Sequence, residues 1–112
     1  MIDHYSFGTL VVDGTEYTSD VIIYGGRVRS WWRETGHAVS RSDVEELVSE
    51  CPSAIIFGTG AYGVMQVGQD VRRFIEGKGI DVIVKRTGEA VREFNQLTEN
   101  GQAVALAAHL TC

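Results

Sequence analysis

Cysteine and proline are scarce in this sequence, and long apolar runs are absent. The two cysteines are Cys51 and Cys112, and the single proline is Pro52. A chain of 112 residues can bury enough apolar surface to fold without a disulfide, so we expect both thiols to be free. The longest apolar stretches, 54–57 and 103–108, are far shorter than the ~20 residues that span a bilayer, which argues against membrane insertion.

Positive charge is also in deficit. The chain has 10 basic and 15 acidic residues and a net charge of -5, whereas a nucleic-acid-binding surface is normally basic, so we expect no nucleic-acid partner. The histidines and cysteines are scattered without metal-ligand spacing. His37 and His109 could meet in the fold, but we expect neither a metal site nor a cofactor. Residues 1–5 lack the basic and apolar segments of a secretory signal, so we expect a cytoplasmic protein.

The remaining composition is that of an ordinary globular domain. Hydrophobic residues make up 44% of the chain and charged residues 22%. A chain of this length forms one core, not two, and no linker, repeat or low-complexity segment divides it. We therefore expect a single domain over residues 1–112.

The first third of the sequence predicts three strands. Residues 7–12 and 16–24 are rich in β-formers and are separated by Asp13-Gly14, a strong two-residue hairpin turn. Gly25-Gly26 forms a second tight turn, and residues 27–32 alternate between basic and apolar side chains. The expected arrangement is an N-terminal β-meander.

The remainder alternates between helix and strand patterns. Ser42 with Glu45 resembles a capping box, followed by an apolar stripe that includes Cys51 and ends at Pro52. Thr87 is the expected cap of a later helix. The further elements expected are a strand at 54–57, a helix at 69–76, a strand at 80–85, a helix from 87 to about 99 and a strand at 103–109. The fold class is α/β, with the meander followed by αβαβαβ and parallel neighbouring strands.

Residues Gly58-Thr59-Gly60-Ala61-Tyr62-Gly63 form a G-x-G-x-x-G pattern directly after a strand. Such loops let a backbone approach a phosphate, and Lys85 and Arg86 follow the next strand as a basic pair. The acid that a dinucleotide site normally has there is absent, and no chain remains for a second half-domain. The pattern indicates either a sharp structural connection or a site for an anion or small ligand.

A second feature is the aromatic and polar segment 31–37, which contains Trp31, Trp32, Arg33 and His37. Adjacent tryptophans in a strand point to opposite faces, so one belongs to the core and the other is free to form a contact surface. Arg33 can instead simply stack on Trp32 over the meander. We find no catalytic set: the tail 109–112 ends on a thiol beside negative charge, and no Ser–His–acid arrangement stands out.

The remaining inference comes from a resemblance over nearly the whole chain. Its motifs are Phe7-Gly8, Ser19-Asp20-Val21-Ile22-Ile23, Trp31-Trp32-Arg33, Gly36-His37, Ile56, Gly58-Thr59-Gly60, Gly63, Thr87, Ala90, Phe94-Asn95 and His109-Leu110-Thr111-Cys112. In this order and spacing, the sequence resembles the small one-domain family that contains the human adipogenesis-associated domain protein, a mitochondrial NADH dehydrogenase (complex I) assembly factor and many uncharacterised prokaryotic proteins.

The resemblance implies a three-layer α/β/α domain with a mixed sheet and no established enzyme activity. It also implies action through protein contacts, in assembly or regulation, and a structural role for Asn95 such as bonding a loop backbone. The leading hypothesis is a non-catalytic interaction domain that binds an unknown protein partner through segment 31–37, extended by loop 58–63. The alternative is an anion- or ligand-binding domain, or an enzyme, that uses loop 58–63 with Lys85 and Arg86. A homodimer through the meander is possible.

Overall fold

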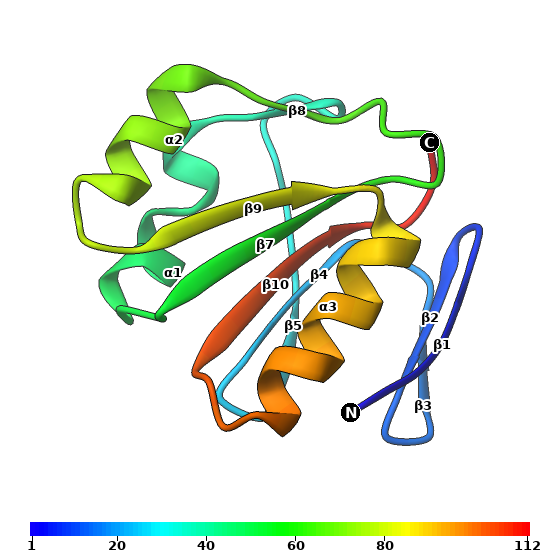
Figure 1. Cartoon of the computed structure of the whole chain (residues 1–112). Coiled ribbons are helices and arrows are strands. Elements are labelled where there is room, and N and C mark those ends of the chain that lie inside the picture. Colours follow the sequence, from blue (N-terminus) through cyan, green and yellow to red (C-terminus); the bar gives the residue numbers. More distant parts are fainter.

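A mixed five-stranded sheet forms the middle layer of the structure, a computed structural model that describes residues 1–112 (Figure 1). The strand order is β5-β4-β10-β7-β9. Strands β10, β7 and β9 run parallel, β4 runs antiparallel to β10, and β5 runs antiparallel to β4. The bounds are β4 Val21–Tyr24, β5 Arg27–Ser30, β7 Ala54–Thr59, β9 Asp81–Lys85 and β10 Val104–His109.

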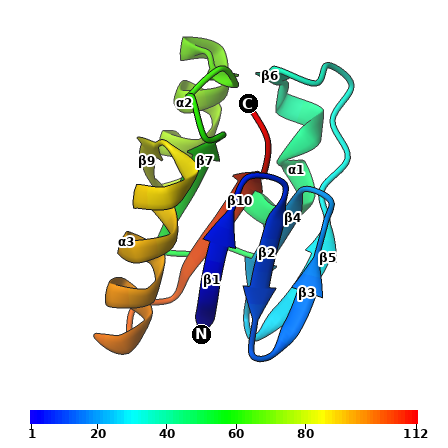
Figure 2. The same ribbon diagram turned by 90° about the vertical axis from the view of Figure 1, so that its right-hand side faces the viewer.

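Helices cover both faces of this sheet because its central strands are apolar throughout. Every residue of β7 and β10 is buried. Ile56 and Leu106 pack towards α3 (Thr87–Glu99), and Ile55 packs towards α1 (Glu45–Ser49) and α2 (Gln69–Glu76). Figure 2 shows these layers from the side. The expected α/β class with a mixed sheet and three layers is confirmed.

The N-terminal segment differs from the predicted meander. It forms a separate three-stranded sheet of β1 (Ile2–Ser6), β2 (Thr9–Val12) and β3 (Thr15–Tyr17) beside α3. The predicted strand 16–24 is therefore two strands in two sheets, since the polar residues 18–20 turn the chain from one sheet into the other. The hairpin at Asp13-Gly14 is confirmed, with φ of 47° and 82°, the left-handed values that a two-residue turn requires.

Asn95 on α3 fastens β1 to the main domain. Its Oδ1 accepts the Ile2 backbone N–H at 2.9 Å, and its Nδ2 donates to the Ile2 carbonyl at 2.9 Å. This two-way bond satisfies an otherwise unpaired backbone at the edge strand. The expectation that Asn95 bonds backbone rather than taking part in chemistry agrees with this geometry.

The start and the end of the first helix differ from the sequence prediction. A 3-10 turn η1 (Arg41–Asp43) precedes α1, and the Ser40 N–H donates to Asp43 Oδ2 at 2.8 Å, so Ser42 is not the cap. Cys51 is not on a buried helix face: it lies beyond the last helical residue, is exposed, and has φ 56°. A residue before proline is driven out of the helical conformation, which ends the stripe early.

Besides β1, which precedes the predicted first strand 7–12, two short strands were not expected. β6 (Ala38–Val39) and β8 (Gln66–Val67) pair in parallel and tie segment 31–39 to the chain that leaves β7. The helices α2 and α3 agree with the predicted segments 69–76 and 87–99. Both cysteines carry free thiols, and Cys51 precedes β7 whereas Cys112 follows its parallel neighbour β10, which puts them at opposite ends of the sheet.

Candidate functional site

Both sites predicted from the sequence lie on one edge of the sheet. β5, β7, β9 and β10 all end there, and the β1–β2 turn joins them through the Gly8 N–H, which donates to the Leu110 carbonyl at 2.8 Å. We call this the carboxyl edge. It consists of 7–8, 20, 31–37, 58–64, 85–87 and 109–112. Open α/β sheets place ligands at such an edge.

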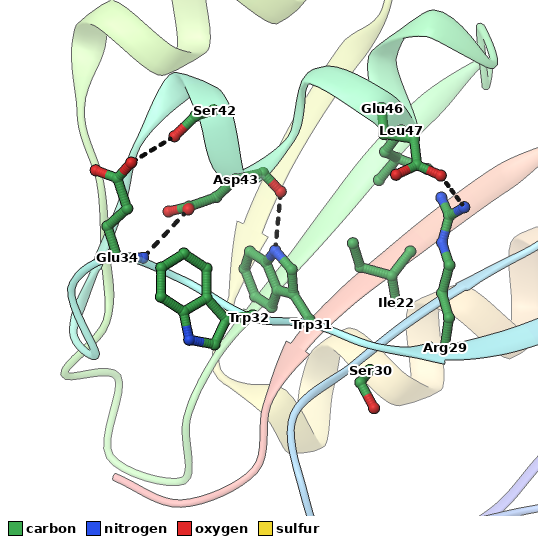
Figure 3. A pocket seen from close by; sticks show the side chains of 10 residues that line it. All are labelled: Ile22, Arg29, Ser30, Trp31, Trp32, Glu34, Ser42, Asp43, Glu46 and Leu47. Atoms are coloured by element: carbon green, nitrogen blue, oxygen red, sulfur yellow. Dashed lines mark hydrogen bonds and ion pairs between the residues drawn. The ribbon is translucent and has the colours of Figure 1, made fainter.

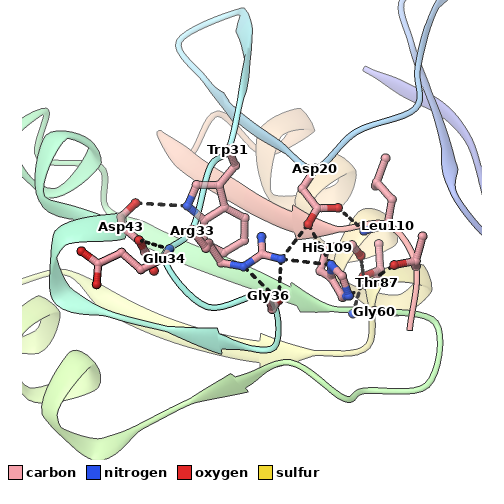
Figure 4. A network of polar contacts seen from close by, with 11 residues as sticks. Asp20, Trp31, Arg33, Glu34, Gly36, Asp43, Gly60, Thr87, His109 and Leu110 are labelled. Atoms are coloured by element: carbon pink, nitrogen blue, oxygen red, sulfur yellow. Dashed lines mark hydrogen bonds and ion pairs between the residues drawn. The ribbon is translucent and has the colours of Figure 1, made fainter.

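A buried ion network lies at the centre of the carboxyl edge (Figure 4). Asp20 Oδ2 receives Arg33 Nη2 at 2.7 Å and His109 Nδ1 at 2.8 Å, and Asp20 Oδ1 receives the Leu110 N–H at 2.8 Å. The side chains of Arg33 and His109 are 5% and 7% exposed, so the contacts lie almost entirely out of water. The network joins the start of β4, the segment after β5 and the end of β10.

The charge state of this network follows from its contacts. Burial by itself would raise the pKa of Asp20, but the hydrogen bonds from His109, the Leu110 backbone and Arg33 outweigh it and hold that pKa below its usual value. Since the ionised carboxylate only accepts, the 2.8 Å contact with Asp20 is made by an N–H on His109 Nδ1, and the Arg33 Nη2 that lies 3.2 Å from the same nitrogen then donates to Asp20 and Gly36 instead. The His109 Nε2 then faces the Thr111 hydroxyl at 3.5 Å, and the His37 ring lies edge-on to it with centroids 5.4 Å apart.

His37 and His109 meet in the fold, as the sequence allowed. The structure contains no group of three or more His, Cys, Asp or Glu side chains arranged to hold a metal ion. Asp20 already binds the Nδ1 of His109, and this hydrogen bond fixes the orientation of the imidazole ring.

Arg33 fixes the shape of segment 31–37. Its guanidinium carbon lies 4.5 Å from the centroid of the Trp31 ring, and its Nη2 also donates to the Gly36 carbonyl at 2.7 Å. Trp31 is buried and donates from Nε1 to the Asp43 carbonyl at 3.1 Å. Trp32 points the other way and is 76% exposed. Arg33 therefore stacks on the buried tryptophan, and the exposed one stands free on a rigid support.

Loop 58–63 is occupied by the chain's own tail. The Ala61 N–H donates to the Thr111 carbonyl at 2.6 Å, and the Val64 N–H donates to the backbone oxygen of Cys112 at 3.0 Å. A Cβ on Gly60 would lie 2.3 Å from the Cys112 carbonyl carbon, so the second glycine lets the tail approach. The tail thus takes the Ala61 and Val64 N–H groups, which a bound phosphate would otherwise need, and fills the space beside Gly60.

Thr87 and Gly58 explain the rest of the loop. Thr87 is the first residue of α3 and not its cap: its hydroxyl donates to the His109 carbonyl at 2.6 Å and accepts the Gly60 N–H at 2.8 Å. A Cβ on Gly58 would lie 2.9 Å from that hydroxyl, so glycine allows α3 to pack close to β7. Thr59 is buried and donates to the Lys85 carbonyl at 3.1 Å.

The structure brings only one of the two predicted basic residues to the loop. The Arg86 side chain packs over Gly63, where Arg86 Nε would lie 3.4 Å from an added Cβ. Lys85 turns to Glu93 on α3, with Nζ 3.6 Å from the carboxylate. Both side chains are exposed, and they do not converge on a cavity.

A pocket opens beside Trp32, between β5 and α1 (Figure 3). Its volume is about 330 Å³. Three carboxylates and one guanidinium line it, and Arg29 is already paired with Glu46 at 3.2 Å and with Glu50 at 2.6 Å. The lining residues are Ile22, Arg29, Ser30, Trp31, Trp32, Glu34, Ser42, Asp43, Glu46 and Leu47. The pocket thus combines an exposed indole with an excess of negative charge.

A second exposed aromatic pair lies on the carboxyl edge. Phe7 and Tyr62 are 55% and 67% exposed, and their ring centroids are 6.0 Å apart. They come from the β1–β2 turn and loop 58–63, and both segments are held by backbone bonds to 110–112. Exposed aromatic side chains on fixed backbone are typical of contact surfaces.

Sequence reasoning missed Asp20 as the centre of the polar network and Glu34, Asp43 and Glu46 as the pocket's acids. Asp20 and His109 are 89 positions apart, so no local spacing relates them. The signals for Asp20 were its place directly before an apolar strand and its presence in one of the motifs that carry the family resemblance. Glu34 belongs to the segment that contains Trp32, but Asp43 and Glu46 read as cap and exposed-helix residues in the sequence, and only folding brings the three acids to one opening.

Comparisons with known proteins give a family and a fold. A family model described as "Protein of unknown function (DUF498/DUF598)" matches residues 2–109. The conserved hypothetical protein PH1505 from Pyrococcus horikoshii OT3 is similar with 27% identity and a TM-score of 0.91, covering 100% of this chain and 99% of that one. The protein MT938 shares 30% identity at a TM-score of 0.87, covering 100% and 98%.

A protein described as an outer membrane protein from Bartonella henselae also shares the fold, at 23% identity and a TM-score of 0.86 over 99% of this chain and 94% of that one. In the present structure, no helix has the length and apolar character that crossing a membrane requires.

Proposed function

We propose that this chain, which belongs to the DUF498/DUF598 family of proteins of unknown function, is a protein-interaction domain whose partner inserts a basic side chain beside Trp32. The observation that carries the proposal is the 330 Å³ pocket with an indole 76% exposed at its wall. Trp is among the residues that contribute most to protein interfaces, and carboxylates around it favour Lys or Arg from the partner.

Rigidity of the support adds to this proposal. Arg33 and Trp31 are buried in the polar network and hold the backbone on which Trp32 stands, so they act as positioning residues. Little conformational freedom is then lost when a partner binds. His37, exposed on the same segment, extends the proposed contact surface, whereas the Phe7–Tyr62 pair lies outside the pocket.

An assembly role is a finer proposal. It rests on the resemblance to the adipogenesis-associated domain protein and the complex I assembly factor, whose known members act through protein contacts. A cytoplasmic location likewise stays a prediction, made from the lack of a secretory-signal pattern in residues 1–5. The assembly role concerns which partner is bound, and the location concerns where binding takes place. Neither changes the chemistry proposed for the pocket.

Selection of peptide binders tests the proposed function. Random peptides displayed on phage and selected on the wild-type protein are expected to be enriched in Lys or Arg. Trp32→Ala is expected to weaken a selected peptide about 30-fold, the loss typical of a central interface tryptophan. Titration followed by isothermal calorimetry gives the dissociation constants.

Tyr62→Ala is the matched control, because it removes an equally exposed aromatic side chain outside the pocket. It is expected to change the affinity of the same peptides about twofold at most. Peptides without basic residues, or peptides that bind Trp32→Ala as tightly as wild type, would show that this pocket is not the contact site.

The alternative, an anion or nucleotide site at loop 58–63, predicts a different outcome. We expect no change in melting temperature with inorganic phosphate, ATP or NADP, because the tail already binds the Ala61 N–H and packs against Gly60. A ligand present at 100 times its dissociation constant would add about 2.7 kcal/mol of stability, which a thermal-shift assay detects easily. A shift that disappears in Arg86→Ala would establish the anion site instead.

A further inference from the structure

β9 is an edge strand with unpaired backbone groups. Its only neighbour in the sheet is β7, and in Figure 2 it is the outermost strand, between α2 and α3. The Asp81 N–H donates to the Ser53 carbonyl at 3.2 Å, so in the alternating pattern of a parallel ladder the odd-numbered residues of β9 face β7. The N–H and C=O groups of Val82 and Val84 therefore point away from the sheet.

The sequence of β9 suits antiparallel pairing with a second copy of the same strand. β9 reads Asp-Val-Ile-Val-Lys from Asp81 to Lys85. In antiparallel pairing with a second copy centred on Ile83, each Asp81 lies opposite a Lys85, each Val82 lies opposite a Val84, and the two Ile83 side chains meet. Opposite charges and β-branched pairs placed directly across two strands both stabilise a sheet.

The hydrogen bonds agree with the same register. Val82 and Val84 hold the outward-facing groups, and this pairing sets them opposite each other as hydrogen-bonded pairs, two per dimer. Asp81 opposite Lys85 and Ile83 opposite Ile83 are then the non-hydrogen-bonded pairs, where side chains come closest. The side chains of Val82, Ile83 and Val84 are only partly covered in the single chain, with Val84 37% exposed.

We propose that two copies of this chain associate through antiparallel pairing of β9 about a two-fold axis, which joins their sheets into one of ten strands. This symmetry makes the same strand both halves of the interface. Lys85 is available for the new pair, since its contact with Glu93 is long, at 3.6 Å, and partly exposed. The Asp81 side chain is exposed and has no hydrogen-bond partner in the single chain that the pairing would break.

The other edge strand does not offer this complementarity. β5 carries Arg27 and Arg29 and no acidic residue, so self-pairing would add positive charge to both sides of the interface. β5 also leads directly to Trp32. Association through β9 therefore leaves the proposed partner pocket free, and the two proposals stand or fall separately.

Charge exchange tests the proposed dimer. Sedimentation velocity from about 1 to about 500 µM, the range suited to a small interface, is expected to show a concentration-dependent dimer of the wild-type protein. Asp81→Lys and Lys85→Asp are each expected to raise the dimer dissociation constant about tenfold, because both ionic pairs become repulsive. Mixing the two variants, or combining them in one chain, is expected to restore association.

The mixture guards against misfolding as the cause of a lost dimer, since misfolded variants would not recover by being mixed. Hydrogen exchange adds a site-specific readout: the amides of Val82 and Val84 are expected to become protected as concentration rises, whereas those of Asp81 and Ile83 are protected throughout. A wild-type protein that stays monomeric at every concentration overturns the proposal. So does a mixture that associates no better than either single variant.

Discussion

Replacing Arg33 by alanine is expected to lower the free energy of unfolding by about 3–5 kcal/mol, the usual loss when one partner of a buried ion pair is removed. Arg33 is 5% exposed and is the cation that faces Asp20, whose carboxylate would stay buried without its counter-charge. The substitution also removes the group stacked on Trp31 and the donor that holds the Gly36 carbonyl. Urea denaturation followed by circular dichroism measures the change.

Arg92→Ala is the matched control, because it removes an arginine from the exposed face of α3. Its expected effect is within about 0.5 kcal/mol. If Arg33→Ala is no more destabilising than Arg92→Ala, the network does not support segment 31–37.

The pH dependence of the free energy of unfolding is a second test of the network around Asp20. Because folding holds the pKa of Asp20 below its usual value, the carboxylate's contribution to stability is complete above the unfolded pKa of about 4. It is lost as the pH falls from there through the lower pKa of the folded state. The stability difference between wild type and Asp20→Asn is therefore expected to be largest near neutral pH and to shrink below about pH 4. A difference independent of pH would contradict the assigned charge state.

Gly60→Ala is the second substitution with a large expected effect, a loss of about 2–4 kcal/mol. The residue has φ 103°, a conformation that alanine rarely adopts, and its Cβ would meet the Cys112 carbonyl carbon at 2.3 Å and His109 Cδ2 at 2.9 Å. Relief of this clash requires the tail to leave loop 58–63, which breaks the bonds from Ala61 and Val64. The midpoint of thermal unfolding measures the loss.

Gly88→Ala is the matched control in the neighbouring helix. Gly88 lies in the first turn of α3, and an added Cβ meets nothing within 4 Å. Alanine is expected to leave stability unchanged or to raise it by up to about 1 kcal/mol, since it favours the helix. Equal effects of the two substitutions would mean that close packing of the tail on Gly60 does not contribute to stability.

The helices and the buried strands were predictable because their signals are local. The apolar stripe of α2 and the unbroken apolar runs of β7 and β10 each lie within one short segment, and the two predicted glycine turns fall where the structure has them. The first helix shows the limit of such reasoning. Ser42 has the right residue type for a cap, but Asp43 bonds the Ser40 backbone instead, and a single sequence does not rank competing local bonds.

The site was predictable only in part. The sequence singled out segments 31–37 and 58–63, but the contacts that each segment makes depend on residues far away in the chain. Trp31 rather than Trp32 is buried because it packs against Phe57 and donates to the Asp43 carbonyl, contacts that no local spacing reveals. The glycine pattern resembles a phosphate loop in isolation, and the tail that fills it is about 50 positions further along the chain.

The sequence by itself determined the α/β class and the acidic character, because periodicity and charge are properties of the chain alone. With two cysteines and no disulfide, apolar packing on both faces of the sheet holds the fold together. Tertiary structure decided what the chain can present to a partner: it buried Arg33 against Asp20, exposed Trp32 above a pocket lined by acids, and left β9 at an open edge. These outcomes depend on contacts between distant segments, whose strength changes with burial, and burial exists only once the sheet has formed.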